Sequence, residues 1–160
     1  MPFKSEQVDK FGAITLDFCS KLTEKELIRR FSNAAATNFS SNPLIYKHNN
    51  HKIKFILRNI VYSGNPLPLN KKRVQVLAKY IDLLKQPNVF LLGLYSYDEQ
   101  NICCIFNPLR YTKAKTKSYT SSHIKTIDLI NARNDVFENN NGDYLFEISN
   151  LDQALCMMLD

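Results

Sequence analysis

The first clear pattern of apolar positions along the chain is helical and begins at Thr23. Residues 23–26, Thr-Glu-Lys-Glu, form a capping box in which the threonine hydroxyl serves the backbone N–H of Glu26 and the glutamate reaches back. Apolar residues follow at helical spacing: Leu27, Ile28, Phe31, Ala34 and Ala35. The pattern predicts a helix that ends between residues 38 and 41, before the breaker Asn42-Pro43. The residues before 23 are weakly patterned and predict a short strand or irregular packing.

The middle of the chain has the apolar pattern of strands. Residues 52–62 predict one strand, and residues 71–76 predict a short basic strand, although residues 74–85 also fit an amphipathic helix. The strongest signal is a hairpin whose apolar strands, 89–96 and 102–106, are joined by a polar turn. Because both strands are apolar at nearly every position, we expect this hairpin to be central.

The last third of the chain predicts shorter elements. Residues 109–123 form a long polar segment, and residues 124–132 fit a strand. A turn at 139–143 precedes a strand at 144–148, and residues 150–159 fit a helix whose pattern is cut off at the end of the chain. We therefore expect an α+β fold that is mostly β, in the amino-terminal fragment of a longer protein.

Length and composition are those of an ordinary globular protein. The chain has 160 residues, of which 44% are hydrophobic and 22% charged, which is enough for one domain with a sizeable core. No apolar run reaches the roughly 20 residues of a membrane helix, and the start lacks the pattern of a signal peptide. We expect a single cytoplasmic domain over residues 1–160, with a helical segment at 1–50 packed on a core at 52–150, and no membrane partner.

Basic and acidic residues are separated along the chain, which suggests what kind of partner it binds. The formal net charge is +6, and residues 27–81 and 100–127 contain no acidic residue. From residue 128 onward the ionisable residues are acidic apart from Arg133. A surface that served solubility alone would intersperse the two signs, whereas this segregation suits a polyanionic partner.

The sequence lacks the motifs that common catalytic sites require. It contains no P-loop, GxSxG or HExxH motif, and no aspartate followed by the Glu-x-Lys of metal-dependent restriction nucleases. His48 and His51 lack the two further ligands of a structural metal site, so we expect a solvated loop there. The vicinal Cys103 and Cys104 are expected to be small apolar residues of a strand. We therefore predict no catalytic residue, no metal and no cofactor.

Two polar segments without acids are the candidate DNA-binding site: residues 62–75, the first arm, and residues 112–123, the second arm. Lysines neutralise phosphates, while hydroxyl, amide and guanidinium groups contact phosphates or read base edges in the major groove. The candidate residues of the first arm are Tyr62, Ser63, Asn65, Asn70, Lys71, Lys72, Arg73 and Gln75. Those of the second arm are Lys113, Lys115, Thr116, Lys117, Ser118, Tyr119, Thr120, Ser121, Ser122 and His123. A flexible Ser/Thr/Lys loop is the alternative interpretation of the second arm.

Several segments in a fixed order resemble a known family. These are residues 55–60, 72–76, 89–108 and 141–146, and they resemble the DNA-binding pseudobarrel domains of bacterial restriction endonucleases. That group includes effector-type enzymes and LlaJI-type McrBC-like restriction subunits, and it is similar to the plant B-three domain. The resemblance implies a seven-stranded open pseudobarrel whose two arms clamp the major groove. Phe106 departs from the family pattern, which usually has a tryptophan there.

Charge pattern and resemblance together predict sequence-specific recognition of double-stranded DNA by the targeting domain of a restriction endonuclease. The nuclease or motor domain would lie in the same chain or in a partner subunit. Both arms are expected to project from one end of the barrel. The alternative is a module that flips a modified base or binds RNA, for which an aromatic pocket would be needed. The tyrosines that could line such a pocket are Tyr95, Tyr97, Tyr111 and Tyr119.

Overall fold

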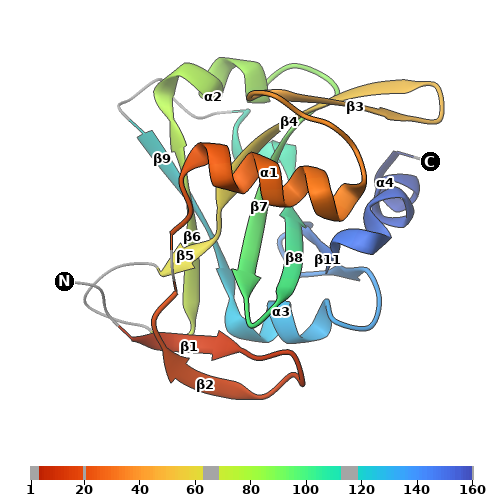
Figure 1. Cartoon of the computed structure of the whole chain (residues 1–160). Coiled ribbons are helices and arrows are strands. Elements are labelled where there is room, and N and C mark those ends of the chain that lie inside the picture. Colours follow the sequence, from red (N-terminus) through yellow and green to blue (C-terminus); the bar gives the residue numbers. More distant parts are fainter. Residues whose placement is uncertain (1–3, 20, 63–68, 113–118, 160) are drawn as a thin grey trace.

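The computed structural model describes residues 4–19, 21–62, 69–112 and 119–159 (Figure 1). These residues form an α+β fold that is mostly β, as the sequence predicts. Their strands belong to three sheets, of six, three and two strands, where the sequence predicts a single seven-stranded pseudobarrel. None of the three sheets closes into a barrel within the described residues.

The largest sheet has the strand order β10-β11-β8-β7-β4-β3. Its strands are β3 (Leu44–His48), β4 (His51–Asn59), β7 (Val89–Tyr97), β8 (Gln100–Ile105), β10 (Phe137–Glu138) and β11 (Tyr144–Glu147). The predicted apolar hairpin is confirmed as β7 and β8, and it lies at the centre of this sheet. β4 and β7 pair in parallel, so the chain must leave the sheet between them and cross over.

That crossover forms part of a second sheet, with the order β5-β6-β9. Its strands are β5 (Val61–Tyr62), β6 (Lys71–Leu77) and β9 (Tyr119–Lys125), and α2 (Ala78–Leu84) follows β6 directly. The sequence predicts either a strand at 71–76 or a helix at 74–85. The structure has both, a strand over Lys71–Leu77 followed by a helix over Ala78–Leu84.

The region around residue 125 differs from the sequence prediction. β9 occupies the end of the segment predicted to be a polar arm, and α3 (Thr126–Asn131) replaces the strand predicted at 124–132. The carboxylate of Asp128 accepts a hydrogen bond from the backbone N–H of Lys125 at 3.0 Å. This contact caps the first turn of α3, because it satisfies an N–H that has no partner within the helix.

The predicted N-terminal cap of α1 (Glu24–Ala35) is confirmed. Thr23 Oγ1 accepts from the backbone N–H of Glu26 at 3.2 Å and donates to the Glu26 carboxylate at 2.8 Å. The helix ends earlier than predicted, at Ala36, whose φ of 52° is left-handed. There the N–H of Thr37 turns back to the carbonyl of Ser32 at 3.0 Å.

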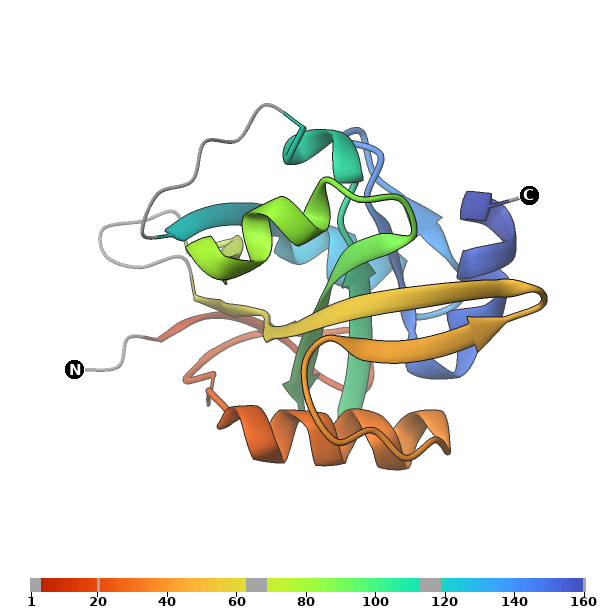
Figure 2. The same cartoon turned by 90° about the horizontal axis from the view of Figure 1, so that it is seen from above.

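The six-stranded sheet has an apolar core on each face. α1 and α4 (Leu151–Leu159) cover one face, and the three-stranded sheet lies with α2 and α3 against the other (Figure 2). Cys103 belongs to the first core and Cys104 to the second, both fully buried, so the prediction that they are small apolar strand residues is confirmed.

The N-terminal segment contains strands as well as the predicted helix. β1 (Ser5–Val8) and β2 (Ile14–Asp17) form a two-stranded sheet, and the backbone N–H of Val8 donates to the hydroxyl of Tyr95 at 3.1 Å. Ile14 and Leu16 lie on one face of β2 and are more than half exposed.

His48 is not in a solvated loop as predicted. It is 3% exposed, with Nδ1 3.0 Å from the carboxylate of Asp152 on α4. His51 is exposed as predicted, but it is the first residue of β4 rather than part of a loop. Alternation along β3 turns His48 inward, which the short polar sequence around it does not reveal.

Candidate nucleic-acid interface

β6 and β9 each present polar side chains on one face and buried side chains on the other. The alternation follows from strand geometry, in which successive side chains point to opposite sides. Apart from Leu77, an exposed apolar residue at the end of β6, the half-buried or exposed positions are Lys71, Arg73 and Gln75 on β6, and Ser121, His123 and Lys125 on β9. The buried positions between them are Lys72, Val74, Val76, Ser122 and Ile124.

The antiparallel register places the outward side chains in two adjacent rows. Its directly opposed pairs are Lys71 with Lys125, Arg73 with His123, and Gln75 with Ser121. We call these six residues the β6–β9 strip. Opposed side chains in such a pair lie about 5 Å apart, and the strip is roughly 14 Å long at about 3.4 Å per residue.

The strip concentrates positive charge around one histidine. Burial lowers the pKa of His123, and the neighbouring cations Lys71, Arg73 and Arg110 lower it further. His123 is therefore neutral at pH 7, where its ring both donates and accepts hydrogen bonds. The β6–β9 strip itself contains no carboxylate, which leaves its field open to an anion.

Two arginines of this region, Arg58 and Arg73, differ in their hydrogen bonding. Arg58 on β4 donates from Nε to the backbone carbonyl of Gln75 at 2.8 Å, which ties the strip to the large sheet. The Nε of Arg73 is buried without a hydrogen-bond partner among the described residues. A buried donor of this kind is costly unless a ligand satisfies it.

Two predicted DNA contacts are wrong because they point into the protein. Lys72 is fully buried, and its Nζ donates to Ser5 Oγ at 3.0 Å and to Gln7 Oε1 at 3.2 Å. Burial lowers its pKa to about 8. Ser122 is 2% exposed and shares a hydrogen bond of 2.7 Å with the hydroxyl of Tyr111. Neither side chain is available to a phosphate.

The two arms do not enter the fold at the same end. β6 and β9 run antiparallel, with Lys71 opposite Lys125 and Leu77 opposite Tyr119. The first arm leads into β6 at Lys71 and the second into β9 at Tyr119, so these junctions are about 20 Å apart at roughly 3.4 Å per residue. The strip lies between the two junctions; the direction in which the arms project stays a prediction, because residues 63–68 and 113–118 lie outside the described residues.

The remaining predicted contacts divide into two groups. Asn70 is exposed, and its backbone carbonyl accepts from the N–H of Thr126 at 2.8 Å. The others lie outside the described residues, either entirely or in their side chains: Tyr62, Ser63, Asn65, Lys113, Lys115, Thr116, Lys117, Ser118, Tyr119 and Thr120.

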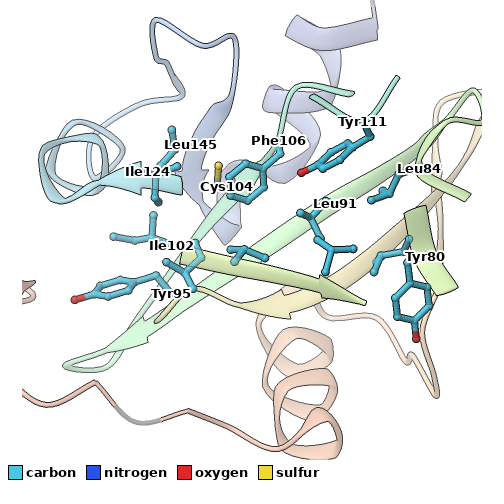
Figure 3. Close-up of a cluster of buried hydrophobic side chains, with 14 of the residues drawn as sticks. Tyr80, Leu84, Leu91, Tyr95, Ile102, Cys104, Phe106, Tyr111, Ile124 and Leu145 are labelled. Carbon is cyan, nitrogen blue, oxygen red and sulfur yellow. The ribbon is translucent and has the colours of Figure 1, made fainter. Parts of the chain in front are cut away.

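Of the tyrosines proposed for an aromatic pocket, the three whose side chains the structure describes are not gathered around a cavity. Tyr95 and Tyr111 are buried in the core between the two larger sheets (Figure 3). Tyr97 donates to the carboxylate of Asp17 at 2.6 Å. The tyrosines whose side chains the structure describes therefore form no stacking pocket for an extruded base.

Sequence reasoning missed three basic residues: Lys125, which belongs to the strip, and Arg58 and Arg110, which lie beside it. All three lie in the acid-free stretches, so the charge pattern contained the signal. They were excluded because the arms were defined by loop-like composition, whereas these residues lie on or beside strands.

Comparison with known families gives one result. The family model described as methylase-associated X1 matches residues 51–150. No curated protein and no solved structure matches the chain.

Within the described ranges, histidine, cysteine, aspartate and glutamate form no group of three that could hold a metal ion. No helix of the described part has both the length and the apolar character to cross a bilayer.

Proposed function

Because this chain belongs to the methylase-associated X1 family, a restriction–modification context follows, and we propose that it recognises duplex DNA for such a system. The observation that supports this role is the β6–β9 strip, where two basic and polar rows face outward from a well-packed sheet. A strand pair fits the major groove of B-form DNA, which is about 12 Å wide.

The chemistry of the strip suits both parts of DNA recognition. Lys71 and Lys125, at one end, are suited to phosphates, which supply affinity without sequence preference. Arg73 and Gln75 are the side-chain types that pair with guanine and adenine in the major groove. The arginine also has a buried Nε that lacks a partner among the described residues. In this proposal, Arg73 and Gln75 read bases while the two lysines set the register.

In this proposal the chain contributes recognition rather than catalysis. The nuclease, motor or methylase activity of the system belongs to another part of the protein or to a partner subunit. The pseudobarrel relationship remains part of the same proposal, and its support is the order of the motifs at residues 55–60, 72–76, 89–108 and 141–146. Base flipping is not proposed, because Tyr95 and Tyr111 are buried.

Binding to a randomised duplex pool, followed by sequencing of the retained fraction, tests this function. The selected duplex is then used in fluorescence-anisotropy titrations at several salt concentrations. Lys71→Ala should weaken binding to all duplexes and reduce the salt slope by about 0.9, as expected for one lost phosphate contact. Arg73→Ala should instead relax the preference at particular base pairs, by about 1–3 kcal/mol each.

Lys47→Ala is the matched control, because Lys47 is an exposed strand lysine on β3, in the other sheet. It should leave both affinity and salt slope nearly unchanged. The proposal fails if the wild-type protein retains no duplex at low salt, or if Lys47→Ala weakens binding as much as Lys71→Ala.

A further inference from the structure

A cavity of about 300 Å³ opens at the end of the β6–β9 strip where Lys71 faces Lys125. It is formed by β9, the start of α3, the short 3-10 helix Pro108–Arg110 and the turn before β11. Its lining residues are Lys71, Arg110, His123, Ile124, Lys125, Asp128, Asn139, Asn140 and Asn141.

The lining has more positive than negative charge. Three of its side chains are cations, Lys71, Arg110 and Lys125, and one is a carboxylate, Asp128. That carboxylate already accepts from the backbone N–H of Lys125 at 3.0 Å, where it caps α3. With Asp143, which pairs with Arg110 behind the cavity wall, the three cations face two carboxylates, so one positive charge remains for an anion.

The cationic side of the cavity is held rigidly. Arg110 donates to the buried Asp143 through Nε at 3.0 Å and Nη2 at 2.6 Å. Asn139 donates a further hydrogen bond to the same carboxylate, from Nδ2 to Asp143 Oδ2 at 3.2 Å. A guanidinium has five N–H donors, so this ion pair fixes the orientation of Arg110 and leaves donors for a ligand.

His123 lines the cavity, and its pKa depends on the charges around the cavity. Its pKa is lowered first by burial and then by Lys71, Arg73 and Arg110, from β6 and from the 3-10 helix. The other charged groups that line the cavity are Lys125 and Asp128, at the start of α3. An anion bound among these cations would offset their effect and raise the pKa of His123.

We propose that this cavity holds one phosphodiester group of the bound duplex, between Lys71, Arg110 and Lys125. The inference rests on the proposed function and deepens it, because a phosphate held at one end of the strip determines where Arg73 and Gln75 meet the bases. A base is the less suitable occupant, since the lining offers no phenylalanine, tyrosine or tryptophan ring for stacking, and its one aromatic ring is the small imidazole of His123.

Single methylphosphonate substitutions along the selected duplex test the site, because each removes one backbone charge. At one phosphate, the substitution should weaken wild-type binding severalfold. The Lys125→Ala variant should also bind the unmodified duplex severalfold more weakly. Its affinity should fall little further when that same phosphate carries the methylphosphonate. Lys47→Ala, the control, should stay as sensitive to the substitution as the wild type. A purely structural role of Lys125 would not produce this coupling between its side chain and one phosphate.

The His123 ring provides a second readout, by NMR titration of the wild-type protein. Its pKa should rise when the selected duplex is bound. If the duplex binds but no phosphate couples to Lys125 and the pKa of His123 stays unchanged, the cavity is not a phosphodiester site, although the proposed function stands.

Two further probes separate other sources of the same anion. If no duplex binds but inorganic phosphate raises the pKa of His123, both proposals are overturned in favour of a site for free phosphate. If single-stranded RNA of the same sequence produces the full coupling at equal affinity, recognition of duplex DNA is overturned.

Discussion

Arg110 and Asp143 are joined by two hydrogen bonds, Nε to Oδ1 at 3.0 Å and Nη2 to Oδ2 at 2.6 Å. Asp143 is fully buried and also accepts from the backbone N–H of Asn107 at 2.8 Å. Asp143→Asn should lower the free energy of unfolding by about 3 kcal/mol, because it leaves a largely buried guanidinium without its countercharge. Urea denaturation measures this loss.

An exposed ion pair provides the control for that experiment. Lys85 Nζ lies 3.7 Å from the carboxylate of Asp82 on the surface of α2. Asp82→Asn should change stability by no more than about 0.5 kcal/mol, since solvent screens such pairs. Equal losses in the two variants would contradict a structural role for the buried pair.

Lys72 should make the stability of the protein depend on alkaline pH. Its folded pKa of about 8 lies below the ordinary 10.5, so the unfolded chain binds the proton more readily between these values. Wild-type stability should therefore rise with pH across this window relative to Lys72→Met. The difference between the two proteins should shift by about 2 kcal/mol from pH 7 to pH 10.

Comparison with the variant is necessary because other groups titrate nearby. Burial raises the pKa of the Cys103 and Cys104 thiols, which opposes the Lys72 effect above pH 9 in every variant. Lys72→Met should also retain its affinity for duplex DNA, unlike Lys71→Ala; loss of affinity without loss of stability would show that Lys72 does reach the ligand.

Gly93 lies on β7 where the strand packs closely against the side chains of Ile60 and Val74. A Cβ at this position of β7 would lie 2.7 Å from Ile60 Cγ1 and 3.0 Å from Val74 Cγ2. Gly93→Ala should therefore destabilise the fold by about 1–3 kcal/mol, since these buried groups must shift. In the Ile60→Ala background the added cost of Gly93→Ala should be smaller, which a double-mutant cycle of urea unfolding measures. Strict additivity would indicate that the strain lies elsewhere.

Thr23 should contribute measurably to α1. Its side chain accepts from the backbone N–H of Glu26, a donor without a partner inside the helix. Thr23→Ala should cost about 1 kcal/mol of stability, whereas Thr23→Ser should cost much less because the hydroxyl is kept. Thermal unfolding of both variants separates loss of the cap from loss of the methyl group.

The elements with strong local signals were predictable. The cap at Thr23 and the apolar hairpin of β7 and β8 depend on neighbouring residues, and both are confirmed. The strand and helix of residues 124–132 could not be distinguished by apolar spacing. That choice depends on the contact between Asp128 and the Lys125 N–H.

The inward orientation of Lys72 shows why part of the site was not predicted. Alternation along β6 already groups Lys72 with the buried Val74 and Val76. A lysine is so rarely buried that its residue type argues against this position. The groups that make burial possible, Ser5 and Gln7, are more than sixty residues away along the chain, so no local pattern reveals them. Ser122 and Tyr111 show the same difficulty for β9.

The strict two-residue periodicity of β6 also limits how binding specificity could evolve in this family. One inserted or deleted residue within the strand would exchange its two sets of side chains, sending Arg73 and Gln75 into the core and apolar valines to the surface. If the chain recognises DNA as we propose, a new target site would therefore arise by substitution at the outward positions, while changes in length would be confined to connections outside the strands.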